Sequence, residues 1–279
     1  MGIINPKSSL LFLIIFVISN IISAQTLDLQ TIPGHKMQYG FSFYKPFIPD
    51  NANMTFLSGN YSLSLNIPVS SKLNIIGKIP FVNTSYEYDY FFGKYSYSEN
   101  GFGNIFVGLQ TNSRIVNNEK SIFSFGFYLP TASETSSFYG ALTDYYYYSE
   151  YIPNTFSFYF NYAFHKLNAQ GFNYGLEIGP NLLIPTKKNN SDAELLAHYG
   201  ILTGYQINKL LLNVEFIGIA IITEDIENFG DRFVNMVNIG AQWKEAAVTP
   251  KIFYKIYLRS EIRHNIDGIL GIGVNVSIK

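Results

Sequence analysis

The sequence predicts an all-β fold, a closed antiparallel transmembrane β-barrel of about twelve strands of the outer-membrane type. Three observations indicate it. Apolar and polar residues alternate with a period of two over segments of about ten residues, the length that a tilted strand needs to cross a bilayer. Charged residues make up 14%, well below the roughly 25% of soluble domains, whereas aromatic residues reach 17%. The connections between these segments are alternately short and long.

The first 24 residues predict a secretory signal peptide. Lys7 precedes an apolar run at residues 10–22, and the small residues Ser23 and Ala24 follow it. This run is too short for a membrane-spanning helix, which needs about 20 residues. We therefore expect cleavage after Ala24, which leaves residues 25–279 as one barrel domain. The sequence contains no cysteine, which excludes both a lipid anchor on cysteine and disulfides.

Residues 101–132 show the hairpin pattern in full. The apolar residues of the first arm share one phase, with Phe106 as the exception, and the polar turn 112–120 leads to a second arm that alternates in the same way. Side chains on alternate positions of a strand point to opposite faces. The predicted lipid-facing residues of the two arms are Ile105, Val107, Leu109, Phe123, Phe125, Phe127 and Leu129.

The same rule predicts three strands before this hairpin and seven after it. The outward sets before it are Met37, Tyr39, Phe41 and Phe43; Tyr61, Leu63, Leu65 and Ile67; and Leu73, Ile75, Ile79 and Phe81. The clearest pattern follows, with Phe156, Phe158, Phe160, Tyr162 and Phe164. The next sets are Phe172, Tyr174, Leu176 and Ile178, then Leu195, Ala197, Tyr199, Ile201 and Tyr205. The final three are Phe233, Val237, Ile239 and Trp243; Ile252, Tyr254, Ile256 and Leu258; and Leu270, Ile272, Val274, Val276 and Ile278.

The ninth strand, near residues 210–223, is apolar on both phases. We assign Leu212, Val214 and Phe216 to the outward face because Asn213 and Glu215 then point inward.

The connections predict which end of the barrel faces the periplasm. Short links lie at residues 68–71, 112–120, 165–170, 206–208 and 244–248, and long links at residues 83–100 and 131–151. Outer-membrane barrels have short periplasmic turns and longer outer loops. The prolines Pro46, Pro80, Pro130 and Pro185 fall where we expect strands to end in outer loops, since proline cannot donate to a sheet ladder.

Ionisable residues inside the strands fall on the phase opposite the apolar one. The candidate lumen-lining residues are Lys78, Glu177, His198, Glu215, Lys251, Lys255 and Arg259. Paired charges would brace a plugged interior, and unpaired hydrated charges would set the electrostatics of a pore. Lys251, Lys255 and Arg259 have no obvious excess of partners, which favours the hydrated lumen.

Two predicted outer loops are rich in tyrosine. The candidates are Tyr86, Tyr88 and Tyr90 in one and Tyr145, Tyr146, Tyr147 and Tyr148 in the other. Such rings stack flat ligands at an entrance, or they form the aromatic girdle that barrels place at the lipid headgroups. We favour the girdle.

Part of the chain resembles a known family. The pieces are Ile67-Pro68-Val69-Ser70-Ser71-Lys72-Leu73, Lys78-Ile79-Pro80-Phe81, Gly101-Phe102-Gly103-Asn104 and Phe127-Tyr128-Leu129-Pro130-Thr131. In this order, over roughly residues 66–132, they resemble the outer-membrane transporter family named for the meta-pathway of phenol degradation. The resemblance implies a barrel of about this size that admits small aromatic or hydrophobic compounds. It carries over no binding residue.

The remaining motifs exclude several classes of function. The four histidines do not have the spacing of metal ligands, and the sequence contains no nucleotide-binding loop. The net charge is −1, and no cluster of basic residues is present that would bind nucleic acid. We therefore expect no metal, no cofactor, no catalytic residue and no nucleic-acid partner. The expected partners are outer-membrane lipids, the barrel-assembly machinery and a small-molecule substrate, with the oligomeric state left open.

Transport of small, hydrophobic or aromatic compounds is the predicted function, with two alternatives. One is a structural or adhesive barrel with a plugged lumen. The other is an outer-membrane hydrolase in which His198 acts as a base near Ser191 and Asp192.

Overall fold

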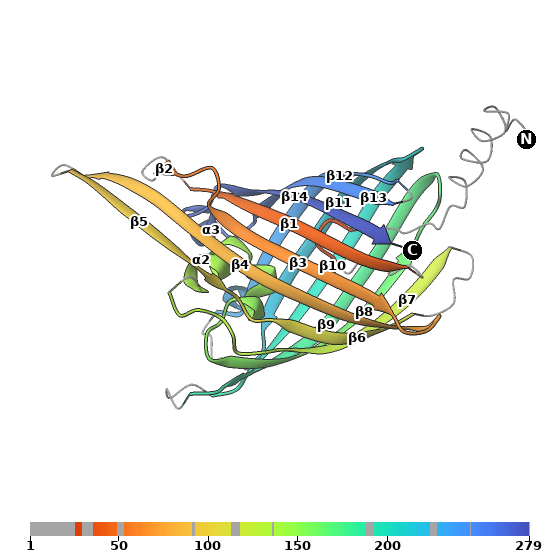
Figure 1. The fold of residues 1–279 in the computed structure, drawn as a ribbon, viewed down its shortest axis with the longest axis horizontal. Helices are drawn as coiled ribbons and strands as arrows, with labels where there is room; N and C mark the ends of the chain where they lie inside the picture. The colour runs from red at the N-terminus through yellow and green to blue at the C-terminus, as the bar shows by residue number, and fades with distance from the viewer. Residues whose placement is uncertain are drawn as a thin grey trace, which may run out of the picture.

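The structure is a computed structural model that describes residues 26–29, 36–48, 53–90, 93–112, 118–135, 137–187, 192–223, 228–245 and 247–278. Within these residues, antiparallel strands form one sheet that closes on itself (Figure 1). Strand β1 pairs with β14 along its whole length, from Met37 opposite Ile278 to Phe47 opposite Gly268. The closed ring has twelve strands, which confirms the predicted fold class.

The ring follows the order of the chain. Its strands are β1 (Met37–Phe47), β3 (Gly59–Pro68), β4 (Leu73–Tyr90), β6 (Phe106–Asn112), β7 (Glu119–Tyr128), β8 (Thr155–Lys166), β9 (Gly171–Pro185), β10 (Glu194–Ile207), β11 (Leu210–Ile221), β12 (Phe233–Trp243), β13 (Val248–Tyr257) and β14 (Gly268–Ile278). Strands β2 (Asn53–Met54) and β5 (Gly93–Phe102) pair only with β4. The helices are α2 (Ser137–Thr143), η1 (Tyr145–Glu150), η2 (Phe229–Arg232) and α3 (Ser260–Arg263). No described helix has the length and hydropathy to cross a membrane.

Side chains alternate between the two faces of the barrel wall. On β7, Phe123 and Phe125 are 58% and 39% exposed on the outer face, whereas Ser124 between them is 3% exposed. The outward rings pack across strands, as Phe125 does on Phe160 of β8 with their centroids 4.7 Å apart. An apolar outer surface on a closed barrel is what contact with lipid requires.

The connections are short at one end of the barrel and long at the other. Residues 69–72, 113–118, 167–170, 208–209 and 244–247 make the short links. The start of β1 and the end of β14 lie at this same end, which is therefore the periplasmic end (Figure 1).

The prediction of an outer loop at residues 83–100 is wrong. Strand β4 continues to Tyr90 and turns back as β5, so this segment is a hairpin that extends the wall (Figure 1). Pro80, predicted at a strand end, lies inside β4 opposite the break between β5 and β6, where its carbonyl accepts from Gly103 N at 2.9 Å. Away from lipid the hairpin needs no apolar outer face, and its buried phase mixes apolar and polar residues, among them Val82, Thr84 and Tyr86. The sequence pattern therefore predicts a loop here rather than a strand.

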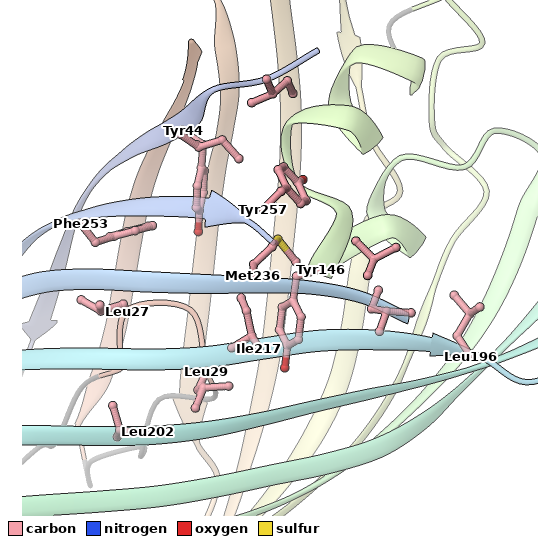
Figure 2. Packing of buried hydrophobic residues seen from close by; sticks show 14 of the residues in the cluster. Leu27, Leu29, Tyr44, Tyr146, Leu196, Leu202, Ile217, Met236, Phe253 and Tyr257 are labelled. Carbon is pink, nitrogen blue, oxygen red and sulfur yellow. The ribbon is translucent and has the colours of Figure 1, made fainter. Parts of the chain in front are cut away.

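Two segments that belong to no barrel strand fill much of the interior. We call residues 26–29 the N-terminal segment and residues 137–151 the strap. All four residues of the N-terminal segment are buried, and the strap crosses the interior where an outer loop was predicted. Figure 2 shows Leu27, Leu29 and Tyr146 packed against inward side chains of the wall.

This packing explains why the ninth predicted strand is apolar on both phases. On β11, Leu211, Ile217 and Ile219 are at most 3% exposed and point inward. Ile217 and Ile219 belong to the cluster that contains Leu27 and Leu29. The inner face of this half of the barrel is therefore a protein core rather than the wall of a water-filled pore.

Candidate functional site

A lysine on the wall holds both inner segments. Lys255 on β13 is fully buried, and its Nζ lies 2.6 Å from Asp28 Oδ2 of the N-terminal segment and 2.8 Å from Asp144 Oδ1 of the strap. Asn238 of β12 adds a hydrogen bond of 2.8 Å to Asp28 Oδ2. A buried ammonium needs such partners, and here both carboxylates come from outside the strands.

The backbone of the N-terminal segment is bound to the wall as well. Both oxygens of Glu215 accept backbone hydrogen bonds, from Leu27 N at 2.6 Å and from Asp28 N at 2.9 Å. Lys251 Nζ donates to the carbonyl oxygen of Leu27. Tyr44 of β1 donates to Asp28 Oδ1 at 3.3 Å. These contacts satisfy backbone groups that would otherwise be buried without partners.

The strap is bound on the opposite side of the lumen. Glu150 Oε1 pairs with Lys78 Nζ of β4 at 2.6 Å, and the same Nζ lies 3.8 Å from the centroid of the Tyr147 ring. Tyr146 donates to Glu177 of β9, and Tyr147 donates to the carbonyl oxygen of Asp28. The strap therefore touches the wall on two sides and the N-terminal segment in the middle.

Burial shifts the pKa values of the acidic groups that these segments carry. Burial raises the pKa of Glu150 to about 7, although the ion pair with Lys78 opposes this shift. Burial also raises the pKa of Asp144 against the attraction of Lys255. For Asp28 burial acts in the same sense, but Lys255 and Lys251 together outweigh it and lower the pKa. Lys255 thus favours the ionised form of both carboxylates, against the effect of burial.

The predicted lumen residues therefore meet partners that the sequence did not indicate. Lys78, Glu177, Glu215, Lys251 and Lys255 all contact the strap or the N-terminal segment. The expectation that the cationic residues of β13 lack partners is not met for Lys251 and Lys255. The acidic partners of these lysines lie outside the strands, at Asp28, Asp144 and Glu150. There, no alternation of apolar and polar residues marks a side chain as pointing inward. The only sign of these acidic partners in the sequence was the surplus of lysine on β13.

Arg259 lies elsewhere than predicted. Strand β13 ends at Tyr257, and Arg259 lies beyond it at the outer end of the barrel, paired with Asp231 at 3.0 Å and Glu261 at 3.2 Å. The predicted strand is too long because Leu258 continues the apolar phase beyond the last residue of β13, and Arg259 instead pairs with acidic groups of neighbouring connections.

His198 points inward and packs among aromatic and polar groups of the wall. Its ring is buried, stacks on Tyr159 with centroids 4.7 Å apart, and places Nε2 3.1 Å from Asn161 Oδ1. Asp192 is exposed in the connection between β9 and β10, and Ser191 lies outside the described residues. The structure thus does not bring Asp192 to His198.

The tyrosine candidates fall into two groups. Tyr86 of the hairpin stacks on Tyr97 at 5.0 Å and contacts Tyr139 of the strap at 5.6 Å, which joins the hairpin to the strap. Tyr88 and Tyr90 belong to β4, and their side chains lie outside the described part of the chain. Tyr145 to Tyr148 lie in η1 inside the barrel, where Tyr145 stacks on Tyr148 at 4.9 Å. The girdle interpretation is therefore wrong for η1.

A polar cavity of about 210 Å³ remains beside these segments. On one side lie inward residues of β1, β3, β4 and β6, and on the other lie the strap and the N-terminal segment. Its polar wall residues include Gln38, Ser42, Ser62, Ser64, Asn66, Gln110 and Asn275. The interior thus has an apolar, packed half and a polar, open half.

Comparison with solved structures identifies the class of barrel. The outer-membrane channel from Pseudomonas putida F1 is similar to this chain with a TM-score of 0.63 and 11% identity, over 91% of this chain and 100% of that one. The protein is an outer-membrane β-barrel. That channel is of the phenol meta-pathway type that residues 66–132 resemble. At 11% identity, the similarity between the two barrels concerns the fold alone.

Two further barrels are less similar. The KdgM porin matches with a TM-score of 0.48 and 6% identity, over 86% of this outer-membrane barrel and 99% of the porin. LpxR from Salmonella typhimurium matches with a TM-score of 0.47 and 10% identity, over 86% of this chain and 100% of LpxR. No protein-family model matches the chain, and no curated protein matches it in sequence.

Proposed function

We propose that this outer-membrane barrel is a gated channel for small molecules, and that the strap and the N-terminal segment together form its gate. The observation that carries the proposal is the position of Lys255. This wall residue binds Asp28 and Asp144 at once, so two separate segments close the lumen through one shared cation. Neither segment contributes to the barrel ladder, and both can leave the lumen without breaking it.

The polar half of the lumen supports a path for solutes. The cavity already separates the gate from the wall formed by β1, β3, β4 and β6. Movement of the strap out of the lumen towards the outer end, or of the N-terminal segment towards the periplasmic end, would lengthen this cavity along the wall. Its volume of about 210 Å³ is below the roughly 300–1,000 Å³ of pockets for drug-sized ligands, so the solute is small.

A second function, a sealed structural or adhesive barrel, is favoured by the same ion pairs. Lys78 and Lys255 both have carboxylate partners, as expected for charges that brace a permanent plug. In that case the gate never opens, and the extended β4–β5 hairpin carries the activity outside the cell.

Single-channel recording in planar bilayers separates the two functions. We expect rare, brief openings for the intact protein and long openings for a variant that lacks residues 26–29. Heat-modified mobility in gels shows that the variant has a folded barrel. A folded variant without conductance would refute the channel and leave the sealed barrel.

We further propose that a signal peptide is removed after Ala24 and that the barrel-assembly machinery inserts residues 25–279 among outer-membrane lipids. Mass spectrometry of the protein purified from outer membranes measures the first residue directly. A chain that retains residues 1–24 would contradict this proposal.

A further inference from the structure

The polar wall of the cavity presents a row of serine hydroxyls, in which Ser62 is buried and Ser64 is exposed. Gly40 on β1 faces Ser64 on β3 and Asn275 on β14. A Cβ atom at Gly40 would overlap Ser64 Oγ and Asn275 Oδ1, so the missing side chain lets these two polar groups lie against the wall. Ser42 and Ser62 face each other two residues further along the same pair of strands.

These hydroxyls are available to a ligand. Ser42, Ser62 and Ser64 line the cavity and have no hydrogen-bond partner among the described residues. Their hydroxyls both donate and accept. Ser62 is only 5% exposed, so the group that it presents is nearly enclosed.

The gate presents an independent acceptor to the same cavity. Glu150 lines it and is 1% exposed, and its Oε1 is taken by Lys78 while Oε2 is buried without a hydrogen-bond partner. An unpaired carboxylate oxygen in such a place costs free energy unless a donor reaches it. A hydroxyl of a bound solute would supply that donor.

Aromatic rings complete the lining. Phe106, Tyr147 and Tyr159 also line the cavity. Aromatic faces pack against the C–H surfaces of a ring-shaped solute, while hydroxyls and amides bind its polar edge. A solute with one apolar face and several hydroxyls at its edge satisfies both sides of this cavity.

The charges select against ions. The lining holds the carboxylates of Asp28, Glu150 and Glu177 and the ammonium groups of Lys78 and Lys251. These charges nearly balance and largely bind one another or the gate, so the lining has no excess of either sign to attract an ion. An apolar aromatic solute would leave the serines and Glu150 Oε2 unpaired.

We propose that this cavity binds a neutral polyhydroxylated ring molecule of monosaccharide size. Its role as the transported solute rests on the proposed function, whereas the binding itself does not. This chemistry differs from the aromatic or hydrophobic compounds that the family resemblance implied.

Ligand-observed saturation-transfer NMR tests the binding. The folded protein is held in lauryldimethylamine oxide micelles, which carry no sugar headgroup, and is titrated with myo-inositol or glucose. Phenol, glucuronate and glucosamine serve as the apolar, anionic and cationic comparators. We expect inositol and glucose to bind more tightly than all three comparators. The double substitution Ser62→Ala and Ser64→Ala should weaken this binding about tenfold, because two hydrogen bonds are lost.

Ser157→Ala is the matched control. Ser157 is also a buried, inward serine without a partner, but it lies on β8 outside the lining of the cavity. Its removal should leave the affinity unchanged. Tighter binding of any comparator, equal effects of the two serine variants, or no binding of either neutral solute would overturn the proposal.

The readout keeps the two proposals apart. Binding in micelles needs no passage through the barrel. Inositol binding by a barrel that stays closed after loss of residues 26–29 would refute the channel and retain the binding site. Conductance without inositol binding would refute the binding site and retain the channel.

Discussion

Asp28 and Lys255 form an ion pair of 2.6 Å in which both side chains are fully buried. Asp28 precedes the barrel and Lys255 lies on its penultimate strand, so the pair joins the two ends of the domain across the lumen. Asp144, from the middle of the chain, reaches the same Nζ. One buried cation therefore contacts both inner segments.

Lys255→Met should open the barrel. The substitution leaves Asp28 and Asp144 without their cation in a buried site, and breaking a buried pair on one side costs about 3–5 kcal/mol. The two segments relieve this cost by moving into water. We expect the open probability in planar bilayers to rise at least tenfold.

Lys209→Met is the control for this change. Lys209 pairs with Glu245 at 2.8 Å at the periplasmic end, where both side chains are exposed. Such a pair contributes about 0–1 kcal/mol, so its loss should not affect gating. Equal open probabilities for the two variants would show that Lys255 does not hold the gate.

Glu215→Ala should loosen the N-terminal segment without disrupting the strand pairing of the barrel. Glu215 accepts the backbone N–H groups of Leu27 and Asp28. Hydrogen bonds to a charged group contribute about 1.5–3 kcal/mol each, so amide exchange at these two residues should speed up at least tenfold. Hydrogen–deuterium exchange with mass spectrometry measures this rate. Glu119→Ala is the control, because Glu119 on β7 forms a partly exposed pair with Lys166 on β8, and it should leave the exchange rate unchanged. Retained protection of Leu27 and Asp28 in Glu215→Ala would contradict the anchoring role.

Gating should depend on pH through Glu150. Its pKa is about 7 in the closed barrel and near 4.5 in water. The closed state thus binds a proton that the open state releases between these values. This contribution to closure is complete below about pH 4.5 and is lost as the pH rises through about 7. We expect the open probability to rise several-fold between pH 5 and about 7.5.

The groups that act on Glu150 are Lys78 on β4, Asp144 on the strap and Asp28 on the N-terminal segment. Glu150→Gln removes the titrating group and should flatten the pH profile. Glu134→Gln, at an exposed glutamate of the same connection, should preserve it. A profile of Glu150→Gln that still follows the wild type would assign the pH dependence to another group.

Gly179→Ala should impair folding of the barrel. A Cβ atom at Gly179 would overlap the carbonyl oxygen of Phe160, a backbone atom of β8 that cannot move aside. The neighbouring Pro180 lies where the β8–β9 pairing is interrupted between Tyr159 and Tyr162. We expect a loss of at least about 2 kcal/mol in the free energy of unfolding, measured in urea by gel mobility. Gly77→Ala on β4, whose Cβ would lie 3.7 Å from Phe106 O, should cost less than half of this.

The sequence by itself determined the wall of this protein. Phe123, Ser124 and Phe125 alternate because a strand between lipid and lumen presents every second side chain to each. This local rule predicted the twelve strands, the closed class of fold and the periplasmic end. It failed for the β4–β5 hairpin, whose buried face mixes apolar and polar residues such as Val82 and Thr84, so that the chemical contrast between the two faces disappears.

Only the tertiary structure decided what fills the lumen. Asp28 and Lys255 are far apart in the chain, and no period relates a residue of a connection to the face of a strand. Inward-facing Ile217 looked anomalous in the sequence because its partner, Leu29, lies outside the barrel strands. A barrel wall follows from contrasts between neighbouring residues, whereas a gate depends on contacts between distant ones.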